Sequence, residues 1–408
     1  MNFIRGGVCA AKGFSANGVH CGIRKGREKR DLALIFSAVP ASSAAVFTKN
    51  LVKGAPLVVT KNNIQASKNI SQAVICNSGI ANTCNADGIE IAEQMCKLAA
   101  ESLNIEPEKI IVGSTGVIGQ KLNIEPVKNG IHELVSGLEN SQQGSDYAAE
   151  AIMTTDTVKK EIAVEFEING VTCHMGGIAK GSGMIHPNMA TMLVFITTDT
   201  AINGELLQKA LSQQVPETFN MLSIDGDTST NDMAVVLANG MAENDLINSE
   251  GENFNIFNDA LNKIMAGLAR MLAADGEGAT KLLECKISGA KDLQTARIAA
   301  KSVICSNLFK AAMFGADANW GRVLCALGYS GVDIDPLKVD VAFKSPAGQI
   351  EVCKNGTGLD FSEELAKTIL SEKEIEILVN LNLGEAKAIA WGCDLTYDYV
   401  KINGSYRS

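Results

Sequence analysis

Several features that often reveal the class of a protein are scarce in this chain of 408 residues. It has only four histidines, and they form no cluster with the spacing of metal ligands. Its eleven cysteines are scattered from Cys9 to Cys393 without a single CxxC pair. A structural zinc site needs such closely spaced ligands. We therefore expect no bound metal, and we expect the thiols to stay reduced, as they do in the cytosol.

The sequence also has no long apolar run and no basic excess, and we expect no leader. No window reaches the roughly 18 uninterrupted apolar residues of a membrane span. The start, MNFIRGGVCAAKGF, has neither the apolar region of a signal peptide nor the arginines of a transit peptide. The net charge of -10 argues against binding to the phosphate backbone of a nucleic acid, which requires a basic face. We expect a cytoplasmic protein with neither a membrane nor a nucleic acid as partner.

Linkers, repeats and low-complexity segments are absent as well. The chain has only eight prolines, and 46% of its residues are hydrophobic, which is enough to bury a sizeable core. We expect a globular protein whose domain boundaries follow from the order of its elements.

Strand-like and helical segments alternate along the chain. Short apolar runs at 73–76, 109–113 and 282–287 are typical of strands, and residues 89–103 and 260–274 are typical of helices. This alternation favours an α/β fold with α+β layering, in which helices pack on sheets.

Two further segments predict strands near the middle and the end of the chain. The alternating run EIAVEFEINGVTCHM turns at Asn169-Gly170, which is a strong hairpin signal. The last segment, AKAIAWGCDLTYDYVKING, alternates like a terminal strand.

Three glycine-rich or acidic segments suggest ligand sites, but each has a simpler interpretation. GGIAKGSG (176–183) follows the hairpin and offers no helix N-terminus to a phosphate. GEGATK (276–281) is typical of a turn after a helix, although Glu277 between its glycines is free to approach a ligand. DGDTSTND (225–232) has carboxylates that suit a metal, but it is more typical of a solvated turn.

Thr191 stands where a loop containing glycine and proline meets a buried apolar run, in GMIHPNMATMLVF (183–195). A threonine becomes a strong nucleophile when a free α-amino group beside its hydroxyl accepts the proton. That requires a cut before Thr191, and Ala190 is small enough to leave its carbonyl open to attack. His186 is a second candidate base. The simpler alternatives are a threonine that begins a strand and a histidine in a loop.

The segment KGSGMIHPNMATML (180–193) closely resembles the self-cleavage motif of the glutamate N-acetyltransferase and ornithine acetyltransferase family of arginine biosynthesis. Other segments resemble family segments in family order: GGVCAAKGF, GSTGVIG, AIMTTDT, DGEGATK, MFGADANWGR and CDLTYDYVKING. The resemblance implies an N-terminal-nucleophile architecture and a precursor that cuts itself into an α chain, 1–190, and a β chain, 191–408. Two copies of each chain are expected to form a heterotetramer.

The resemblance also implies roles for individual residues. Thr191 would attack the acetyl carbonyl of N2-acetylornithine to form an acetyl-threonine ester, and L-glutamate would then take the acetyl group. A turn formed by GSTG is expected to aim the Thr115 hydroxyl and the Gly116 amide at the oxyanion. Substrate contacts are assigned to Thr154, Lys180, Thr191, Glu277, Asn403 and Ser408. Of these, Lys180 suits the α-carboxylate and Glu277 suits the δ-ammonium group of ornithine.

Two other classes of protein remain open at this point. A self-processing aminopeptidase or amidohydrolase of similar architecture would use the same nucleophile and release the acyl group to water. A binding protein without chemistry would stay uncut. No cofactor is expected. Acetyl-CoA as a second acetyl donor, which would add an amino-acid acetyltransferase activity, also remains open because no motif decides it.

Overall fold

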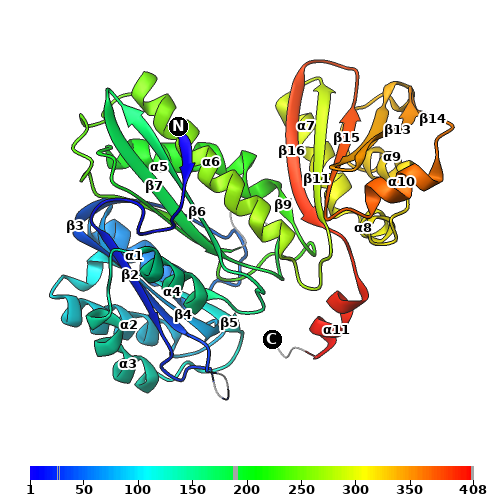
Figure 1. Ribbon diagram of the computed structural model, residues 1–408. Helices are drawn as coiled ribbons and strands as arrows, with labels where there is room; N and C mark the ends of the chain where they lie inside the picture. The colour runs from blue at the N-terminus through cyan, green and yellow to red at the C-terminus, as the bar shows by residue number, and fades with distance from the viewer. Residues whose placement is uncertain (25, 27, 187–191, 406–408) are drawn as a thin grey trace.

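The computed structural model describes residues 1–24, 26, 28–186 and 192–405. Within these residues the strands form two sheets (Figure 1). The first sheet has the order β1 (Asn2–Ile4), β6 (Lys160–Ile168), β7 (Val171–Lys180), β8 (Leu193–Thr198), β10 (Met233–Ala238), β3 (Leu32–Phe47), β4 (Ile70–Ile80) and β5 (Ile110–Val117), with β2 (Phe14–Val19) paired to β3.

The second sheet is built from the C-terminal part of the chain. Its order is β14 (Thr357–Gly358), β13 (Gly348–Lys354), β12 (Asp340–Ser345), β15 (Glu374–Asn380), β11 (Leu282–Ala290), β16 (Ala386–Cys393) and β9 (Leu222–Ser223). The sheet is mixed, since β11 runs parallel to β15 and antiparallel to β16.

Helices cover both faces of the first sheet. Helix α4 (Gln142–Ile152) packs on one face, and α5 (Gly204–Gln214) and α6 (Glu252–Ala274) pack on the other. Helices α1 (Ala55–Ala66), α2 (Gly88–Leu103) and α3 (Glu125–Ser136) share a core with β3, β4 and β5. The burial of side chains on both faces explains why β10 and residues 193–196 of β8 are continuously apolar rather than alternating.

The remaining helices belong to the second sheet and to the tail. Helices α7 (Leu293–Cys305), α8 (Asn307–Phe314), α9 (Trp320–Gly328) and α10 (Glu363–Leu370) lie beside the second sheet, and α11 (Tyr397–Ser405) extends away from β16 (Figure 1). The core of the second sheet is continuous with the core under α5 and α6. Among the described residues, no helix has the length and apolar composition needed to cross a bilayer.

The expected α/β fold, with helices packed on sheets, is confirmed. The helix predicted at 89–103 is α2, and the predicted hairpin joins β6 to β7 through Asn169 and Gly170. Both residues have positive φ, 49° and 82°, as the Asn-Gly hairpin turn requires. The helix predicted at 260–274 is confirmed as the second half of α6.

Two local predictions are wrong. The GSTG segment is not a turn, because β5 continues to Val117 and pairs in parallel with β4, with Ser114 opposite Asn77. The tail is not strand throughout, because β16 ends at Cys393 and α11 follows. The Asp394 carboxylate accepts hydrogen bonds from the amides of Thr280 and Lys281, which ends the sheet at this point.

The first sheet is assembled from both sides of position 191. Strand β8 pairs with β7, Leu193 opposite Lys180, and β10 pairs with β8, Met233 opposite Leu193. Strands β8 and β10 therefore lie inside a sheet whose other strands all come from residues before 181. Hydrogen bonds along both edges of the β8 and β10 pair join the two parts of the chain.

Candidate active site

A pocket of about 160 Å³ lies where β5, the end of β7, the loop before β10 and α11 meet. Six of the residues singled out from the sequence line it: Thr115, Gly116, Thr154, Lys180, Glu277 and Asn403. They come from segments that are up to 288 positions apart, 403 minus 115. Ala190, Thr191 and Ser408 lie outside the described residues.

One wall of the pocket is built by Thr115 and Gly116. Lys180 Nζ donates to Thr115 Oγ1 at 3.2 Å, so the Thr115 hydroxyl keeps its own proton for another acceptor. Gly116 has φ 129°, and a Cβ there would stand 2.2 Å from the carbonyl carbon of Gly79 on β4. Only glycine fits this position, because the pairing of β4 with β5 brings the two backbones together.

Lys180 is a buried cation at the end of β7, with 8% of its surface exposed. Burial lowers its pKa, and the Asp156 carboxylate opposes that effect. A compact ammonium in this setting suits a ligand carboxylate, since an ion pair recovers part of the cost of burying the charge.

The loop before β10 is more buried than the sequence predicted. The interpretation of 225–232 as a solvated turn is wrong for its second half, because Thr230, Asn231 and Asp232 are each less than a tenth exposed. Asn231 Nδ2 donates to the carbonyls of Ala81 and Ser114, at 2.6 and 3.0 Å, and so ties the loop to β5. A polar residue there is held inside because it satisfies backbone groups that the sheet leaves free.

Asp232 is a buried acid that the sequence reasoning missed. Burial raises its pKa well above the ordinary value for an aspartate, with Lys180 and hydrogen bonds from neighbouring side chains acting in the opposite direction. Its Oδ2 has no hydrogen-bond partner among the described residues. The only signal in the sequence is its position directly before the apolar strand β10, where a side chain faces the interior.

Glu277 and Asn403 form the opposite wall. Asn403 Nδ2 donates to Glu277 Oε2 at 2.7 Å, and Glu277 is 9% exposed. The tail reaches this point because Thr396 Oγ1 donates to the Gly278 carbonyl at 2.6 Å just before α11 begins. The tail thus brings Asn403 to the pocket, on a helix and not on a strand.

Residues 184–186 are held by the loop that begins at Asp225. The Asp225 carboxylate accepts from the amides of Met184 and Ile185, at 2.6 and 2.9 Å. Met184 has φ 55°, a conformation that costs energy for a residue with a side chain and that these bonds stabilise. The His186 carbonyl accepts from Thr228 Oγ1 at 2.8 Å, so the loop contacts three consecutive residues.

His186 does not line the pocket. Its Nδ1 lies 3.0 Å from Ser223 Oγ and 3.6 Å from Cys305 Sγ. Burial and the nearby Lys301 lower its pKa to about 4, so the imidazole is neutral near pH 7. Among the described residues there is also no group of three side chains arranged to hold a metal ion.

The comparison with protein-family models decides the family. The model for the ArgJ family matches residues 15–408. The chain belongs to the ArgJ family. The family comprises bifunctional proteins of arginine biosynthesis, the same acetyltransferase family whose motifs the sequence resembles, and this chain is an acyltransferase of that pathway.

Full-length relatives of the ArgJ family are similar to nearly the whole chain. "Arginine biosynthesis bifunctional protein ArgJ 1" of Clostridium acetobutylicum is 53% identical over 97% of this chain and 96% of the relative. The ArgJ protein of Caldanaerobacter subterraneus subsp. tengcongensis is 51% identical over 100% of both chains. A crystal structure of the ArgJ protein of Bacillus halodurans is 47% identical, with a TM-score of 0.50, and the match covers 52% of this chain and 98% of that one.

Proposed function

We propose that this enzyme transfers the acetyl group of N2-acetylornithine to L-glutamate through an acetyl ester on Thr191. The observation that carries the proposal is the gathering of Thr115, Gly116, Lys180 and Glu277 around one pocket. These residues provide oxyanion donors, a cation and an anion. An acetylated amino acid with a carboxylate at one end and an ammonium group at the other matches that set of charges.

The proposed reaction begins with attack on the amide of acetylornithine. Thr191 Oγ adds to the acetyl carbonyl carbon, and the freed α-amino group of Thr191 takes the hydroxyl proton. The Thr115 hydroxyl and the Gly116 amide stabilise the oxyanion. The C–N bond then breaks, the proton passes to the leaving nitrogen, and ornithine departs from the acetyl ester.

The second half of the cycle repeats these steps in reverse. The α-amine of glutamate attacks the ester carbonyl, the same donors stabilise the second oxyanion, and the C–O bond to Thr191 breaks. The Thr191 oxygen regains its proton, and N-acetylglutamate is released. Lys180 binds the α-carboxylate in both halves, whereas Glu277 faces the δ-ammonium group that only ornithine carries.

We propose further that the free α-amine arises by self-cleavage between Ala190 and Thr191, which gives chains 1–190 and 191–408. The crystal structure from Bacillus halodurans supports this, because a polypeptide covered to 98% spans only 52% of this chain and is therefore about half as long. The shared sheet supports the proposal that the two products stay together, as part of a heterotetramer of two α and two β chains.

The test is an assay of purified protein with acetylornithine and glutamate, following N-acetylglutamate and free acetate separately. Transfer to glutamate supports the proposal. Release of acetate alone would favour the aminopeptidase or amidohydrolase alternative. The absence of both products would favour a binding protein. Replacing acetylornithine by acetyl-CoA in the same assay tests the second donor, which the word "bifunctional" in the names of the relatives supports.

A further inference from the structure

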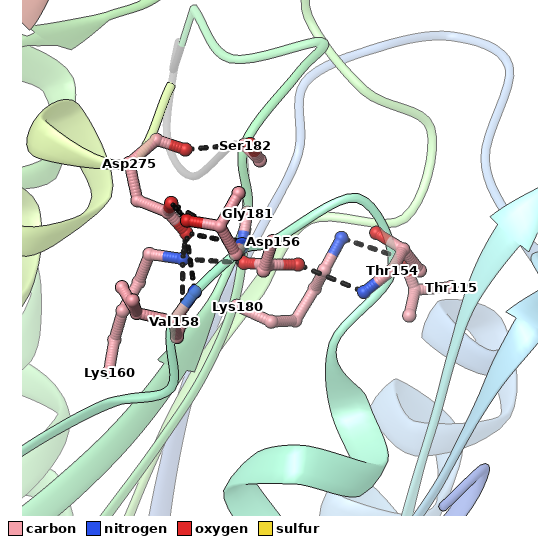
Figure 2. Close-up of polar contacts among 10 residues, drawn as sticks. Thr115, Thr154, Asp156, Val158, Lys160, Lys180, Gly181, Ser182 and Asp275 are labelled. Atoms are coloured by element: carbon pink, nitrogen blue, oxygen red, sulfur yellow. Dashed lines mark hydrogen bonds and ion pairs between the residues drawn. The ribbon is translucent and has the colours of Figure 1, made fainter. Parts of the chain in front are cut away.

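Asp156 lies on the same segment as Thr154, between α4 and β6, and its carboxylate reaches the end of β7 that carries Lys180 (Figure 2). Its Oδ2 accepts a hydrogen bond from the Thr154 amide at 2.9 Å, and its Oδ1 accepts one from the Gly181 amide at 2.7 Å. The Asp156 side chain is 0% exposed. A single buried carboxylate therefore connects two walls of the pocket.

Asp156 is also part of a buried ion-pair network. Lys160 Nζ lies 2.7 Å from Asp156 Oδ1 and 2.6 Å from Asp275 Oδ2, with 1% of the Lys160 side chain exposed. Asp275 follows the last residue of α6, and its carbonyl accepts from Ser182 Oγ at 2.6 Å. The network joins β6, the end of β7 and the end of α6 (Figure 2). Loss of one member of such a network is costly because it leaves a buried charge unpaired.

The ionisable groups with the largest electrostatic effect on the Lys180 pKa come from different segments: Asp156 from the segment after α4, Lys160 from β6, Asp232 from the loop before β10 and Cys76 from β4. Lys160 repels the Lys180 ammonium, so only the other three can favour it.

Burial disfavours the charged form of two of those three. Burial raises the pKa of the Cys76 thiol to about 12, and it raises the pKa of Asp232 well above the ordinary value. Burial opposes ionisation of Asp156 as well, but Lys180, Lys160 and the hydrogen bonds outweigh it and hold the Asp156 pKa below its ordinary range. Asp156 is thus the carboxylate whose surroundings favour its charged form, whereas those of Asp232 disfavour it.

We propose that Asp156 is a positioning residue of the active site, which holds Thr154 and Gly181 in place and supplies the negative charge that balances the Lys180 ammonium. This role rests on the proposed function, in which Lys180 binds the α-carboxylate of both substrates. Asp156 acts through Lys180 and touches neither substrate.

The test is the pH dependence of kcat/KM for acetylornithine, between pH 6 and 10, in the wild type and in Asp156→Asn. A protonated Lys180 is needed for binding, so kcat/KM falls as the pH rises through the Lys180 pKa. Without the Asp156 charge the Lys180 pKa decreases further. The fall of kcat/KM on the alkaline side of the pH profile, here called the alkaline limb, then moves to lower pH. We expect KM at pH 8 to rise by about tenfold or more, with a smaller effect on kcat.

Asp275→Asn is the matched control, because the Asp275 carboxylate pairs with the same Lys160 but, unlike that of Asp156, does not accept the hydrogen bond of the Gly181 amide next to Lys180. Its alkaline limb should stay at the wild-type pH even if overall activity falls. Asp156→Glu keeps the charge and should also keep the wild-type limb. The proposal is overturned if Asp156→Asn shifts the limb no more than Asp275→Asn does, or if the limb of Asp156→Glu moves to lower pH.

Failure of this inference is distinguishable from failure of the proposed function. A wild type that transfers no acetyl group to glutamate would contradict the function itself. A wild type that transfers it normally, with an Asp156→Asn limb in the wild-type position, would contradict the role of Asp156 alone. If Asp156→Asn does not accumulate as folded protein, Asp156→Ser, which also removes the charge, takes its place in the same comparison with Asp275→Asn.

Discussion

At the scale of single residues, the site depends on hydroxyl and amide donors held by the sheet. Thr115 and Gly116 lie near the end of β5, and the pairing of β5 with β4 leaves no room for a side chain at position 116. Donors fixed in this way need no reorganisation when charge develops on the substrate, which is the condition under which they stabilise an oxyanion most.

Replacing Thr115 by Ala removes a hydroxyl that is oriented by Lys180. We expect kcat to fall by a factor on the order of 10² or more with a nearly unchanged KM for acetylornithine, because the lost bond forms in the transition state. Thr115→Ser keeps a hydroxyl and should retain most of the activity. Steady-state kinetics on both variants measure this, and a large increase in KM at constant kcat would place Thr115 among the binding residues instead.

Gly183 offers a way to move Glu277 without replacing it. A Cβ at position 183 would stand 2.4 Å from the Glu277 carboxyl carbon, so Gly183→Ala should displace that carboxylate. Glu277 is proposed to face an ammonium group that glutamate lacks. KM should therefore rise by about tenfold for acetylornithine and much less for glutamate.

Gly328→Ala is the control for this variant, because a Cβ there meets no other atom within 4 Å. Mass spectrometry should confirm that both proteins are cleaved, since Gly183 lies in the segment leading to the cut. Equal increases in KM for the two substrates would contradict the proposed contact between Glu277 and the δ-ammonium group.

At the scale of elements, Asp225 and Thr228 in the loop before β10 bind residues 184–186, which lead toward the proposed cleavage site. Asp225→Ala removes the acceptor for two backbone amides next to Met184, whose φ of 55° needs support. We expect cleavage before Thr191 to slow by about an order of magnitude or more, because the segment loses its defined conformation. The exposed Asp227 gives the control Asp227→Ala. Densitometry of the two fragments over time measures the rate, and equal rates in both variants would exclude this role of Asp225.

Helix α11 gives a second prediction at this scale. Deleting residues 403–408 removes the Asn403 contact with Glu277. We expect kcat/KM to fall by about tenfold to a hundredfold, the effect of losing one or two hydrogen bonds to charged groups, while cleavage before Thr191 proceeds normally. Asn403→Ala alone separates the contribution of that residue from that of Ser408. If the truncated protein had an unchanged kcat/KM, neither residue would belong to the substrate site.

At the scale of the whole molecule, the first sheet is expected to hold two separate chains together. Intact-mass analysis under denaturing conditions should find polypeptides beginning at Met1 and Thr191, which elute as one complex under native conditions because β8 and β10 remain hydrogen-bonded within the sheet. Thr191→Ala should give one uncut, inactive chain, whereas Thr191→Ser should retain part of the cleavage and part of the activity. A fully active uncut wild type would rule out the proposed nucleophile.

The departures of the GSTG segment and of the tail from their predicted conformations have a common cause. GSTG was expected to turn because glycine and serine favour turns, yet β5 runs through it because parallel pairing with β4 satisfies its backbone. The tail was expected to remain in the sheet because its residues alternate, yet Asp394 directs the chain out of the sheet by capping the amides of Thr280 and Lys281. In both cases the partner that decided the conformation is distant in sequence.

The sequence by itself determined the features that depend on neighbouring residues. Apolar periodicity was sufficient for α2, Asn169-Gly170 was sufficient for the hairpin, and the run of motifs was sufficient for the family. Such signals are local, because the period of a helix or the geometry of a two-residue turn involves only a few successive positions.

Only the tertiary structure decided which groups meet and which are charged. Thr115 and Lys180 are 65 positions apart and meet through pairings that no local pattern predicts. Asp156 and Asp232 are the same residue type, yet one has its pKa lowered by two buried lysines and the other has its pKa raised by burial. The ionisation of a buried side chain depends on its solvation and on the charges around it, and both of these arise only when the chain has folded.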